Sequence, residues 1–219
     1  MGRVRRRIQK IGQELEGVRR RRTMYMGRRK SASIPTASLV GYTNAGKSTL
    51  FNRLSGAKVD AADQLFSTLD PVTRRIRFPS GGQLLLTDTV GFIQKLSPTV
   101  VAAFRATLEE LAESDLLLHV VDITHPKAPE QADVVEATLK DLGLGEKPRL
   151  LVINKMDLLP EGGDGASPPP TPGPSRHPSV FISAAKGWNL DLLLEKIESQ
   201  LMAIDRPLMV TGAAVGPDT

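Results

Sequence analysis

Gly41-Tyr-Thr-Asn-Ala-Gly-Lys-Ser48 is the stretch that decides the fold of this 219-residue chain. The spacing Gly-x-x-x-x-Gly-Lys-Ser is that of a phosphate-binding loop, in which backbone N–H groups wrap phosphate oxygens. In such a loop Lys47 reaches the β- and γ-phosphates of a nucleotide, and Ser48 offers its hydroxyl to Mg²⁺. Residues 34–42 predict a buried strand before the loop, and residues 47–54 predict the start of a helix after it. This context predicts a nucleotide site more strongly than the motif alone.

The rest of the chain alternates between strand patterns and helix patterns. Ser80-Gly-Gly82 predicts a hairpin between two of the strands. Strands that alternate with helices favour the α/β fold of P-loop NTPases with a Ras-like G domain, in which helices cover both faces of a mostly parallel sheet. Ligands of such sheets bind beyond the carboxyl ends of the strands. After the phosphate loop we predict strands at residues 74–79, 83–87, 116–122, 150–154 and 180–183, and helices at residues 99–112, 129–142 and 190–202.

A second motif, Asn154-Lys-Met-Asp157, directly follows a predicted strand and selects the base. The carboxylate of Asp157 can accept hydrogen bonds from N1–H and from the exocyclic amine of guanine, whereas adenine would leave it unpaired. We expect Asn154 and the stem of Lys155 to hold the loop and the plane of the ring. Ser183-Ala-Ala-Lys-Gly187 follows the last strand and fits a backbone contact to guanine O6. Together the two motifs predict specificity for guanine.

Asp88-Thr-Val-Gly91 lies at the end of another predicted strand. Asp88 is placed to hold Mg²⁺ through water, and the amide of Gly91 is placed to sense the γ-phosphate. Between this motif and the phosphate loop we expect a threonine that closes on Mg²⁺. Thr68 is the first candidate and Thr73 the second, and the alternative is a polar loop that happens to carry hydroxyl groups.

Two positions bear on the rate of hydrolysis. The glutamine that orients the attacking water in many GTPases is replaced by Phe92, which can neither donate nor accept a hydrogen bond. We therefore expect slow unaided turnover, with Gln94 or a partner positioning the water. Asn44 leaves two interpretations open: its side-chain oxygen helps to hold a monovalent cation such as K⁺ beside the phosphates, or it only braces the loop.

The positive charge of the chain is concentrated at its beginning. Residues 1–30 hold twelve Lys or Arg and two Glu, a local net charge of +10, whereas the whole chain has a formal charge of +5. This basic arm favours a polyanionic partner, RNA above all, and a solvated helix or a fragment is the alternative. A mitochondrial transit peptide is disfavoured because Glu14 and Glu16 interrupt the arm. A helical seam in the arm consists of Val4, Ile8, Ile11, Leu15 and Val18.

Composition excludes several classes of site. Without cysteine the chain can form no disulfide, thiolate metal site or cysteine nucleophile, and it suits a reducing cytoplasm. No apolar run approaches the roughly 18–20 residues that span a bilayer. His119, His125 and His177 are scattered, so we expect structural or exposed histidines and no metal cluster. A cytoplasmic monomer without a membrane span fits these observations.

The patterns divide the chain into a basic helical arm at residues 1–30, a linker at 31–36, a GTPase domain at 37–204 and a tail at 205–219. Within the domain, residues 160–178 are rich in Pro, Gly and Ser. They predict a flexible surface loop, to which we assign no role.

Four stretches resemble a known family: Val40-Gly-Tyr-Thr-Asn-Ala-Gly-Lys-Ser-Thr-Leu-Phe-Asn52, Ala62-Asp-Gln-Leu-Phe-Ser-Thr-Leu-Asp-Pro71, Asp88-Thr-Val-Gly-Phe-Ile93 and Leu116-Leu-Leu-His-Val-Val-Asp122. They are similar to the GTPase domain of the HflX family. The resemblance implies a protein that binds the large ribosomal subunit, splits stalled ribosomes and hydrolyses GTP faster on the ribosome, with some members also using ATP. Phe92 in place of Gln is the usual pattern of that family.

The resemblance also implies a set of site residues. GTP or GDP and Mg²⁺ would be the cofactors, with K⁺ as a further candidate. Around Mg²⁺ we expect Ser48, Thr68 and Asp88, and in hydrolysis we expect Lys47, Thr68, Gly91 and Asn44 to take part. The expected nucleotide contacts are Gly41, Tyr42, Thr43, Asn44, Ala45, Gly46, Lys47, Ser48, Phe66, Ser67, Thr68, Leu69, Asp70, Asp88, Thr89, Val90, Gly91, Asn154, Lys155, Met156, Asp157, Ser183, Ala184 and Ala185.

One departure from the family concerns the N-terminal region. Members of the family carry a substantial domain there that ends in two long helices, and residues 4–22 resemble only the last of them. The resemblance therefore supports the nucleotide site more firmly than ribosome splitting. Two other functions compete with it, namely a ribosome-assembly or RNA-modification GTPase of a related branch and a nucleotide-gated RNA-binding module with little turnover. A P-loop kinase fits poorly, because it has no use for Asn154-Lys-Met-Asp157.

Overall fold

The computed structural model describes residues 34–56, 72–89, 111–159 and 177–204. The chain divides into two compact units, Met1–Ile34 and Pro35–Thr219, and the second contains every strand and helix given below. Outside the described residues lie the predicted basic helix, the tail, nearly all of the proline-rich segment and the predicted helix at 99–112 apart from its last residues.

The described elements alternate between strands and helices. In chain order they are β1 (Thr36–Val40), α2 (Lys47–Ser55), β2 (Val72–Arg77), β3 (Gln83–Asp88), β4 (Leu116–Asp122), α5 (Ala128–Asp141), β5 (Arg149–Asn154), the 3-10 helix η1 (Met156–Leu158), β6 (Ser179–Phe181) and α6 (Leu190–Ile204).

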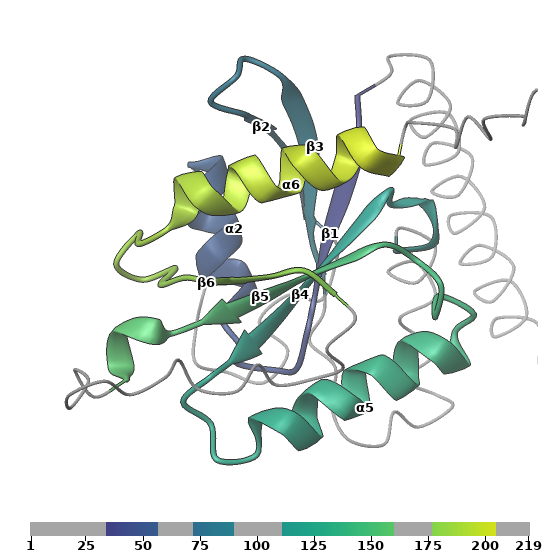
Figure 1. Ribbon diagram of the computed structural model, residues 1–219, viewed down its shortest axis with the longest axis vertical. Coiled ribbons are helices and arrows are strands. Elements are labelled where there is room, and N and C mark those ends of the chain that lie inside the picture. Colours follow the sequence, from purple (N-terminus) through teal and green to yellow (C-terminus); the bar gives the residue numbers. More distant parts are fainter. Residues whose placement is uncertain (1–33, 57–71, 90–110, 160–176, 205–219) are drawn as a thin grey trace, which may run out of the picture. The chain divides into compact units, whose positions relative to one another are not determined.

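A six-stranded sheet forms the centre of the second unit, in the order β2-β3-β1-β4-β5-β6 (Figure 1). Its neighbouring strands are parallel except for the β2–β3 pair, which is antiparallel. That pair is the predicted hairpin, in which Gly81 has a φ of +95° and the N–H of Phe78 donates to the carbonyl of Gly82 at 2.9 Å. The predicted α/β fold with a mostly parallel sheet is confirmed.

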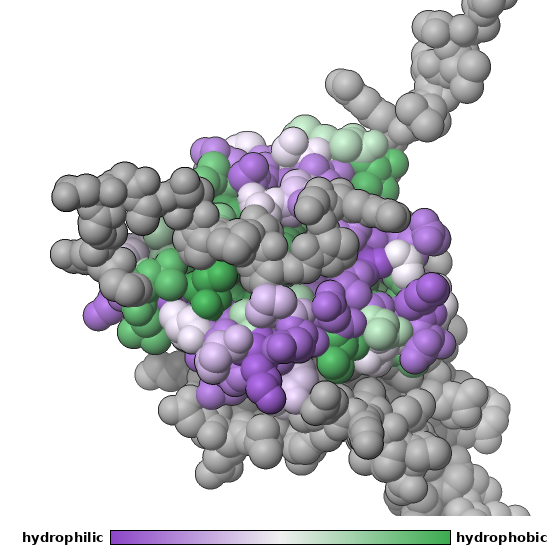
Figure 2. Space-filling model, turned by 60° about the horizontal axis from the view of Figure 1, so that its bottom comes forward, coloured by the Kyte–Doolittle hydropathy of each residue, from purple (hydrophilic) through white to green (hydrophobic). Residues whose placement is uncertain are grey.

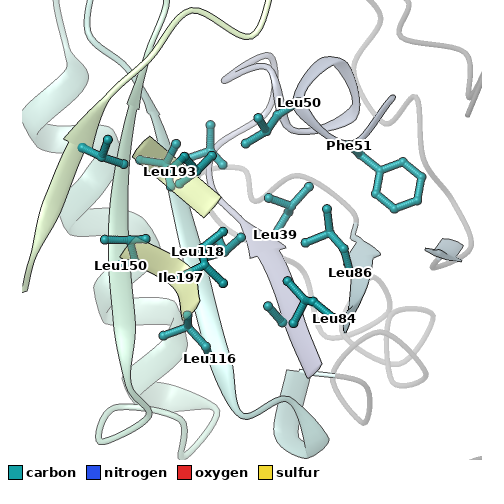
Figure 3. Close-up of a cluster of buried hydrophobic side chains, with 14 of the residues drawn as sticks. Leu39, Leu50, Phe51, Leu84, Leu86, Leu116, Leu118, Leu150, Leu193 and Ile197 are labelled. Carbon is teal, nitrogen blue, oxygen red and sulfur yellow. The ribbon is translucent and has the colours of Figure 1, made fainter. Parts of the chain in front are cut away.

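Helices cover both faces of this sheet, as the sequence predicted (Figure 1). On one face, Phe51 of α2 and Ile197 of α6 belong to the same buried cluster as Leu39 of β1 (Figure 3). On the other face, Val135 of α5 packs with Leu117 of β4 in a second cluster. Burial on both sides explains why β4 is apolar on both faces, apart from His119 and the terminal Asp122, and does not alternate between apolar and polar residues.

The boundaries of the elements follow local chemistry. β4 covers the residues that the sequence predicted, 116–122. β1 ends at Val40, two residues earlier than predicted, because Gly41 turns into the phosphate loop with a φ of +149°. α5 carries Pro129 in its first turn, where a missing N–H costs little. Its buried residues, Ala128, Ala132, Val135 and Leu139, recur at helical spacing.

One face of the described surface carries many polar side chains. In the view of Figure 2, purple hydrophilic side chains are interspersed with smaller green hydrophobic areas. Within the described ranges, no helix has both the length and the apolar character that a membrane crossing requires.

Candidate nucleotide-binding site

The predicted motifs follow the carboxyl ends of the parallel strands. Gly41 follows β1, Asp88 ends β3, Asp122 ends β4, Asn154 ends β5 and Ser183 lies two residues after β6. Because these strands are parallel and adjacent, their carboxyl ends lie along one edge of the sheet (Figure 1). The fold thus brings together residues that are up to 142 positions apart in the sequence.

Two glycines of the phosphate loop are required for different reasons. A Cβ on Gly41 would lie 2.3 Å from the carbonyl oxygen of Val120, so the loop passes against β4 at a distance that no side chain allows. Gly46 has a φ of +95°, and a Cβ there would lie 2.2 Å from Nδ2 of Asn154. The first glycine permits close packing on the sheet, and the second permits both a left-handed backbone and the approach of Asn154.

Lys47 is buried in this loop, although it is a cation. Its Nζ donates to the carbonyl of Gly41 at 3.1 Å and to that of Tyr42 at 2.9 Å. Burial lowers the pKa of Lys47 to about 8, and the attraction of Asp88 opposes this shift only in part. A buried ammonium group whose hydrogen bonds go to carbonyl oxygens is suited to bind an anion such as phosphate.

Ser48 and Asp88 form the second polar contact of the site. The hydroxyl of Ser48 donates to Oδ2 of Asp88 at 2.7 Å, and both side chains are buried. A hydroxyl and a carboxylate are hard oxygen donors of the kind that Mg²⁺ prefers. The structure therefore brings together two of the three residues predicted around Mg²⁺.

Asn154 connects three segments. Its Nδ2 donates to the carbonyl of Ala45 at 2.9 Å, and its Oδ1 accepts from the N–H of Ala184 at 3.0 Å. One buried amide therefore fixes the phosphate loop and the loop after β6 relative to the end of β5. The predicted role of Asn154 in holding the loop agrees with this geometry.

Lys155 is held by a residue for which the sequence suggested no role. It has a φ of +67°, and its Nζ lies 2.8 Å from Oδ2 of Asp122. The other oxygen of Asp122 accepts from the N–H and the hydroxyl of Thr124, at 3.0 and 2.6 Å. Burial alone would raise the pKa of Asp122, but hydrogen bonds from Lys155 and Thr124 hold it below its usual range. The signals in the sequence were its position at the end of a buried strand and its place in one of the four stretches that resemble the HflX family.

The loop after β6 is closed by its own hydrogen bonds. Ser183 and Trp188 form an isolated β-bridge, and the N–H of Gly187 donates to the carbonyl of Ser183 at 2.8 Å. The N–H of Lys186 donates to the Ser183 hydroxyl at 3.0 Å. A second contact that the sequence did not suggest comes from Arg53 of α2, whose Nη2 donates to the carbonyl of Ala185 at 3.0 Å.

A comparison with known proteins agrees with this geometry. The profile of the family described as "50S ribosome-binding GTPase" matches residues 36–155, which is more than half of the chain. The chain belongs to this GTPase family. Its match region contains the phosphate loop, Asp88 and the first two residues of Asn154-Lys-Met-Asp157.

Relatives of the GTPase domain are named HflX, and the resemblance stated from the sequence is confirmed. The chain is 47% identical to GTPase HflX of Caldanaerobacter subterraneus over 90% of the chain and 44% of that protein. It is 43% identical to GTPase HflX of Escherichia coli over 90% of the chain and 46% of that protein. The chain thus spans less than half the length of these two relatives.

A solved structure with the same fold is a GTP-binding protein from the archaeon Sulfolobus solfataricus, in complex with GDP. It is 28% identical, covers 89% of this chain and 61% of that chain, and has a TM-score of 0.59. The fold of the GTPase domain is therefore shared with a protein that holds a guanine nucleotide.

Several residues expected for this GTPase family have no described position. Phe66–Asp70 with Thr68, together with Val90, Gly91, Phe92 and Gln94, lie outside the described residues, so their roles stay predictions. Thr73, the second candidate for the threonine on Mg²⁺, lies in β2 and shares a hydrogen bond with the hydroxyl of Thr87 at 2.9 Å. That hydroxyl is therefore used inside the sheet.

The remaining predicted contacts have described backbones. Asn44 is exposed and has a φ of +61°, a left-handed conformation that asparagine tolerates better than most residues. The hydroxyl of Thr89 donates to the carbonyl of Leu39, which fixes the start of the Asp88 loop on β1. Asp157 lies in η1, and Met156 is held there by its N–H, which donates to the carbonyl of Ile182 at 3.1 Å. Contact of all these residues with a nucleotide stays a prediction.

Proposed function

We propose that this chain binds GTP and GDP at the carboxyl edge of its sheet and hydrolyses GTP to GDP and phosphate. The observation that carries the proposal is the double hydrogen bond of Asn154, to Ala45 and to Ala184. This amide ties the loop expected to hold the phosphates to the loop expected to face the base. The residues that would read the two ends of one nucleotide are thereby built into a single rigid site.

The chemistry of the donors supports Mg²⁺ as the metal. Ser48 and Asp88 would hold it from the described side, and Thr68 is proposed to complete the set. When bound, Mg²⁺ neutralises charge on the β- and γ-phosphates. Lys47 would place its ammonium group against the same phosphates, and its burial makes that charge effective because little water screens it. For Asn44 we propose the role of a K⁺ ligand, with a brace of the loop as the other outcome.

Guanine would be selected by Asp157. Replacing Asp157 by Asn keeps one oxygen that can accept from N1–H and exchanges the second acceptor, opposite the exocyclic amine, for a donor. We expect Asp157→Asn to move the preference from GTP towards xanthosine triphosphate, because xanthine offers an acceptor in place of the exocyclic amine. Competition binding with the two triphosphates measures this. If GTP stays the preferred ligand of the variant, Asp157 does not read the base.

We further propose that the protein acts in the cytoplasm on the large ribosomal subunit. Support comes from the family description and from the +10 charge of residues 1–30, which suits ribosomal RNA. In this proposal the GTPase domain, residues 37–204, is a monomeric switch and the arm is a contact to RNA. The more specific activity that the HflX resemblance suggests is the splitting of stalled ribosomes.

A second candidate function is a nucleotide-gated RNA-binding module with little turnover. Phe92 at the position of the water-orienting glutamine favours it. The two functions share the nucleotide site and differ in whether a partner accelerates hydrolysis.

The deciding experiment measures GTP hydrolysis in potassium buffer with and without purified large ribosomal subunits. Strong stimulation supports a ribosome-coupled GTPase, and repeating the assay in sodium buffer tests the K⁺ role of Asn44. Lys47→Ala serves as the control for contaminating nucleotidases. Turnover that stays slow and does not respond to ribosomes, with tight GTP binding retained, would favour the RNA-binding module.

A further inference from the structure

Arg53 connects the helix that follows the phosphate loop with the loop that follows β6. It lies in the last turn of α2, and its Nη2 donates to the carbonyl of Ala185 at 3.0 Å, across 132 positions of sequence. The same α2 begins at Lys47. A rigid helix of nine residues therefore extends from the phosphate end of the site to the base end.

Two peptide groups flank the one that contains the N–H of Ala185. The hydrogen bond from Arg53 fixes one of them. The peptide between Ala185 and Lys186 is held at its carbonyl by Arg53 and at its N–H by the hydroxyl of Ser183, at 3.0 Å in each case. On the other side, the N–H of Ala184 is held by Asn154. Among the described residues the N–H of Ala185 itself donates to no protein acceptor. It is a donor with a fixed direction and no partner within the described protein.

The guanidinium group of Arg53 passes close to Gly187. A Cβ on Gly187 would lie 3.3 Å from Nη2 of Arg53 and 3.4 Å from its Nε, and Gly187 has a φ of +79°. The absence of a side chain at Gly187 thus leaves the space that the guanidinium group needs. Both the hydrogen bond and the packing place Arg53 over the turn that contains Ala185.

We propose that Arg53 is a positioning residue for guanine recognition, acting through the N–H of Ala185 that donates to O6 of the base. This inference rests on the proposed guanine site. Without Arg53 the peptide between Ala185 and Lys186 keeps only its hydrogen bond to Ser183, so the adjacent N–H of Ala185 loses part of its fixed direction. An interaction that depends on a preorganised donor weakens when the donor must first be ordered.

The test compares two nucleotides that differ only at the atom in question. In 6-thio-GDP a sulfur atom replaces O6, and sulfur accepts hydrogen bonds weakly, while N1–H and the exocyclic amine remain. We expect the wild-type chain to bind GDP more tightly than 6-thio-GDP. Arg53→Ala should reduce that preference by about fivefold, the size of one hydrogen bond, mainly by weakening GDP. Titration calorimetry with both nucleotides measures the ratio.

Lys140→Ala is the matched control. Lys140, like Arg53, is the basic residue in the last turn of a helix, but it lies on α5, on the other face of the sheet. Both variants lose a cation that favours a helix C-terminus, so both have the same effect on the helix dipole. Lys140→Ala should keep the full preference for GDP over 6-thio-GDP. Arg53→Lys keeps a charged donor and should restore part of the preference.

The outcomes separate this inference from the function on which it rests. If the wild type does not prefer GDP to ADP, the proposed guanine site is wrong, and the role of Arg53 falls with it. If the wild type prefers GDP to ADP but binds GDP and 6-thio-GDP alike, only the O6 contact is overturned. If Arg53→Ala weakens both guanine nucleotides by the same factor, Arg53 is merely structural and the inference is overturned.

Discussion

Two buried polar networks of this domain satisfy their charges in opposite ways. At the carboxyl edge of the sheet, Lys47 donates to two backbone carbonyls, and burial lowers its pKa to about 8. Beneath α5, Glu136 lies 3.2 Å from Nδ1 of His119 and forms an ion pair with Arg149. Burial alone would raise the pKa of Glu136, but hydrogen bonds from His119 and Arg149 keep it below its usual range.

The comparison distinguishes a ligand site around Lys47 from a structural cluster around Glu136. The cluster of His119, Glu136 and Arg149 contains its own counter-charges, so it stabilises the fold without a ligand. The ammonium group of Lys47 faces carbonyl oxygens, and within the described part of the chain the carboxylate of Asp88 compensates only part of its burial. Because the buried ammonium group of Lys47 has lost its hydration without a full counter-charge, the binding of an anion stabilises it more than it would an already paired cation.

The largest effect is expected from Lys47→Ala. Removing the ammonium group should weaken GDP binding on the order of 10³-fold, because phosphates in a buried site lose a charge-assisted partner. The free energy of unfolding of the nucleotide-free protein should change little, because the desolvation cost of Lys47 is removed while Asp88 keeps its hydrogen bond from Ser48. Equilibrium binding and urea unfolding measure the two quantities. Unchanged affinity would mean that Lys47 does not hold the phosphates.

Glu136→Ala should show the reverse pattern. It leaves the buried guanidinium of Arg149 without the carboxylate of its ion pair, which lowers the free energy of unfolding by about 3–5 kcal/mol. The affinity for GDP in the folded protein should change by less than about twofold, because Glu136 lies on the face away from the phosphate helix. Asp133→Ala, an exposed acid of the same helix, is the control for removing a charge. A large loss of affinity in Glu136→Ala would erase the contrast between the two networks.

Asp122→Asn tests a polar contact that is intermediate between the Lys47 network and the Glu136 network. Asp122 pairs with Lys155 at 2.8 Å, so its charge is balanced within the protein although it lies beside the base loop. The amide keeps an acceptor but loses the ionic attraction, and we expect a loss of about 1 kcal/mol in GDP affinity, roughly fivefold. A binding assay with GDP and Asp122→Asn checks this. An effect as large as that of Lys47→Ala would show that Asp122 contacts the ligand itself.

The smallest effect is expected on the free energy of unfolding when the pH is lowered. The folded-state pKa of Glu136 lies below its ordinary value, so its contribution to stability is complete above that ordinary value and is lost as pH falls through the folded-state pKa. Between about pH 5 and pH 3, wild type should lose more stability than Glu136→Ala. Urea unfolding across this range gives the difference between the two slopes. Parallel slopes would mean that Glu136 is not held in its charged form by its neighbours.

Much of the fold could be predicted because its signals are local. The apolar run of β4, the turn residues around Ser80 and the glycines at 41 and 46 each determine the backbone within a few residues. The motifs of the nucleotide site were found for the same reason. Lys47 and Asn154 each belong to a short pattern whose spacing reflects the ligand.

The contacts that were not predicted join distant segments. Arg53 reaches Ala185, and Asp122 reaches Lys155, only because the sheet places their strands and helices side by side. His119 was expected to be structural or exposed, and its pairing with Glu136 follows from the way α5 crosses β4. No spacing rule links such residues, because their distance in sequence is set by the lengths of the connections between them.

The hydrogen bond from Asn154 to Ala45 spans 109 positions, and this span gives the site an order in time. During synthesis the N-terminal part of a chain leaves the ribosome first, so the phosphate loop emerges well before Asn154. A nascent chain that ends before β5 holds the whole phosphate-loop sequence without its brace. We therefore expect tight capture of nucleotide only after most of the domain has been synthesised.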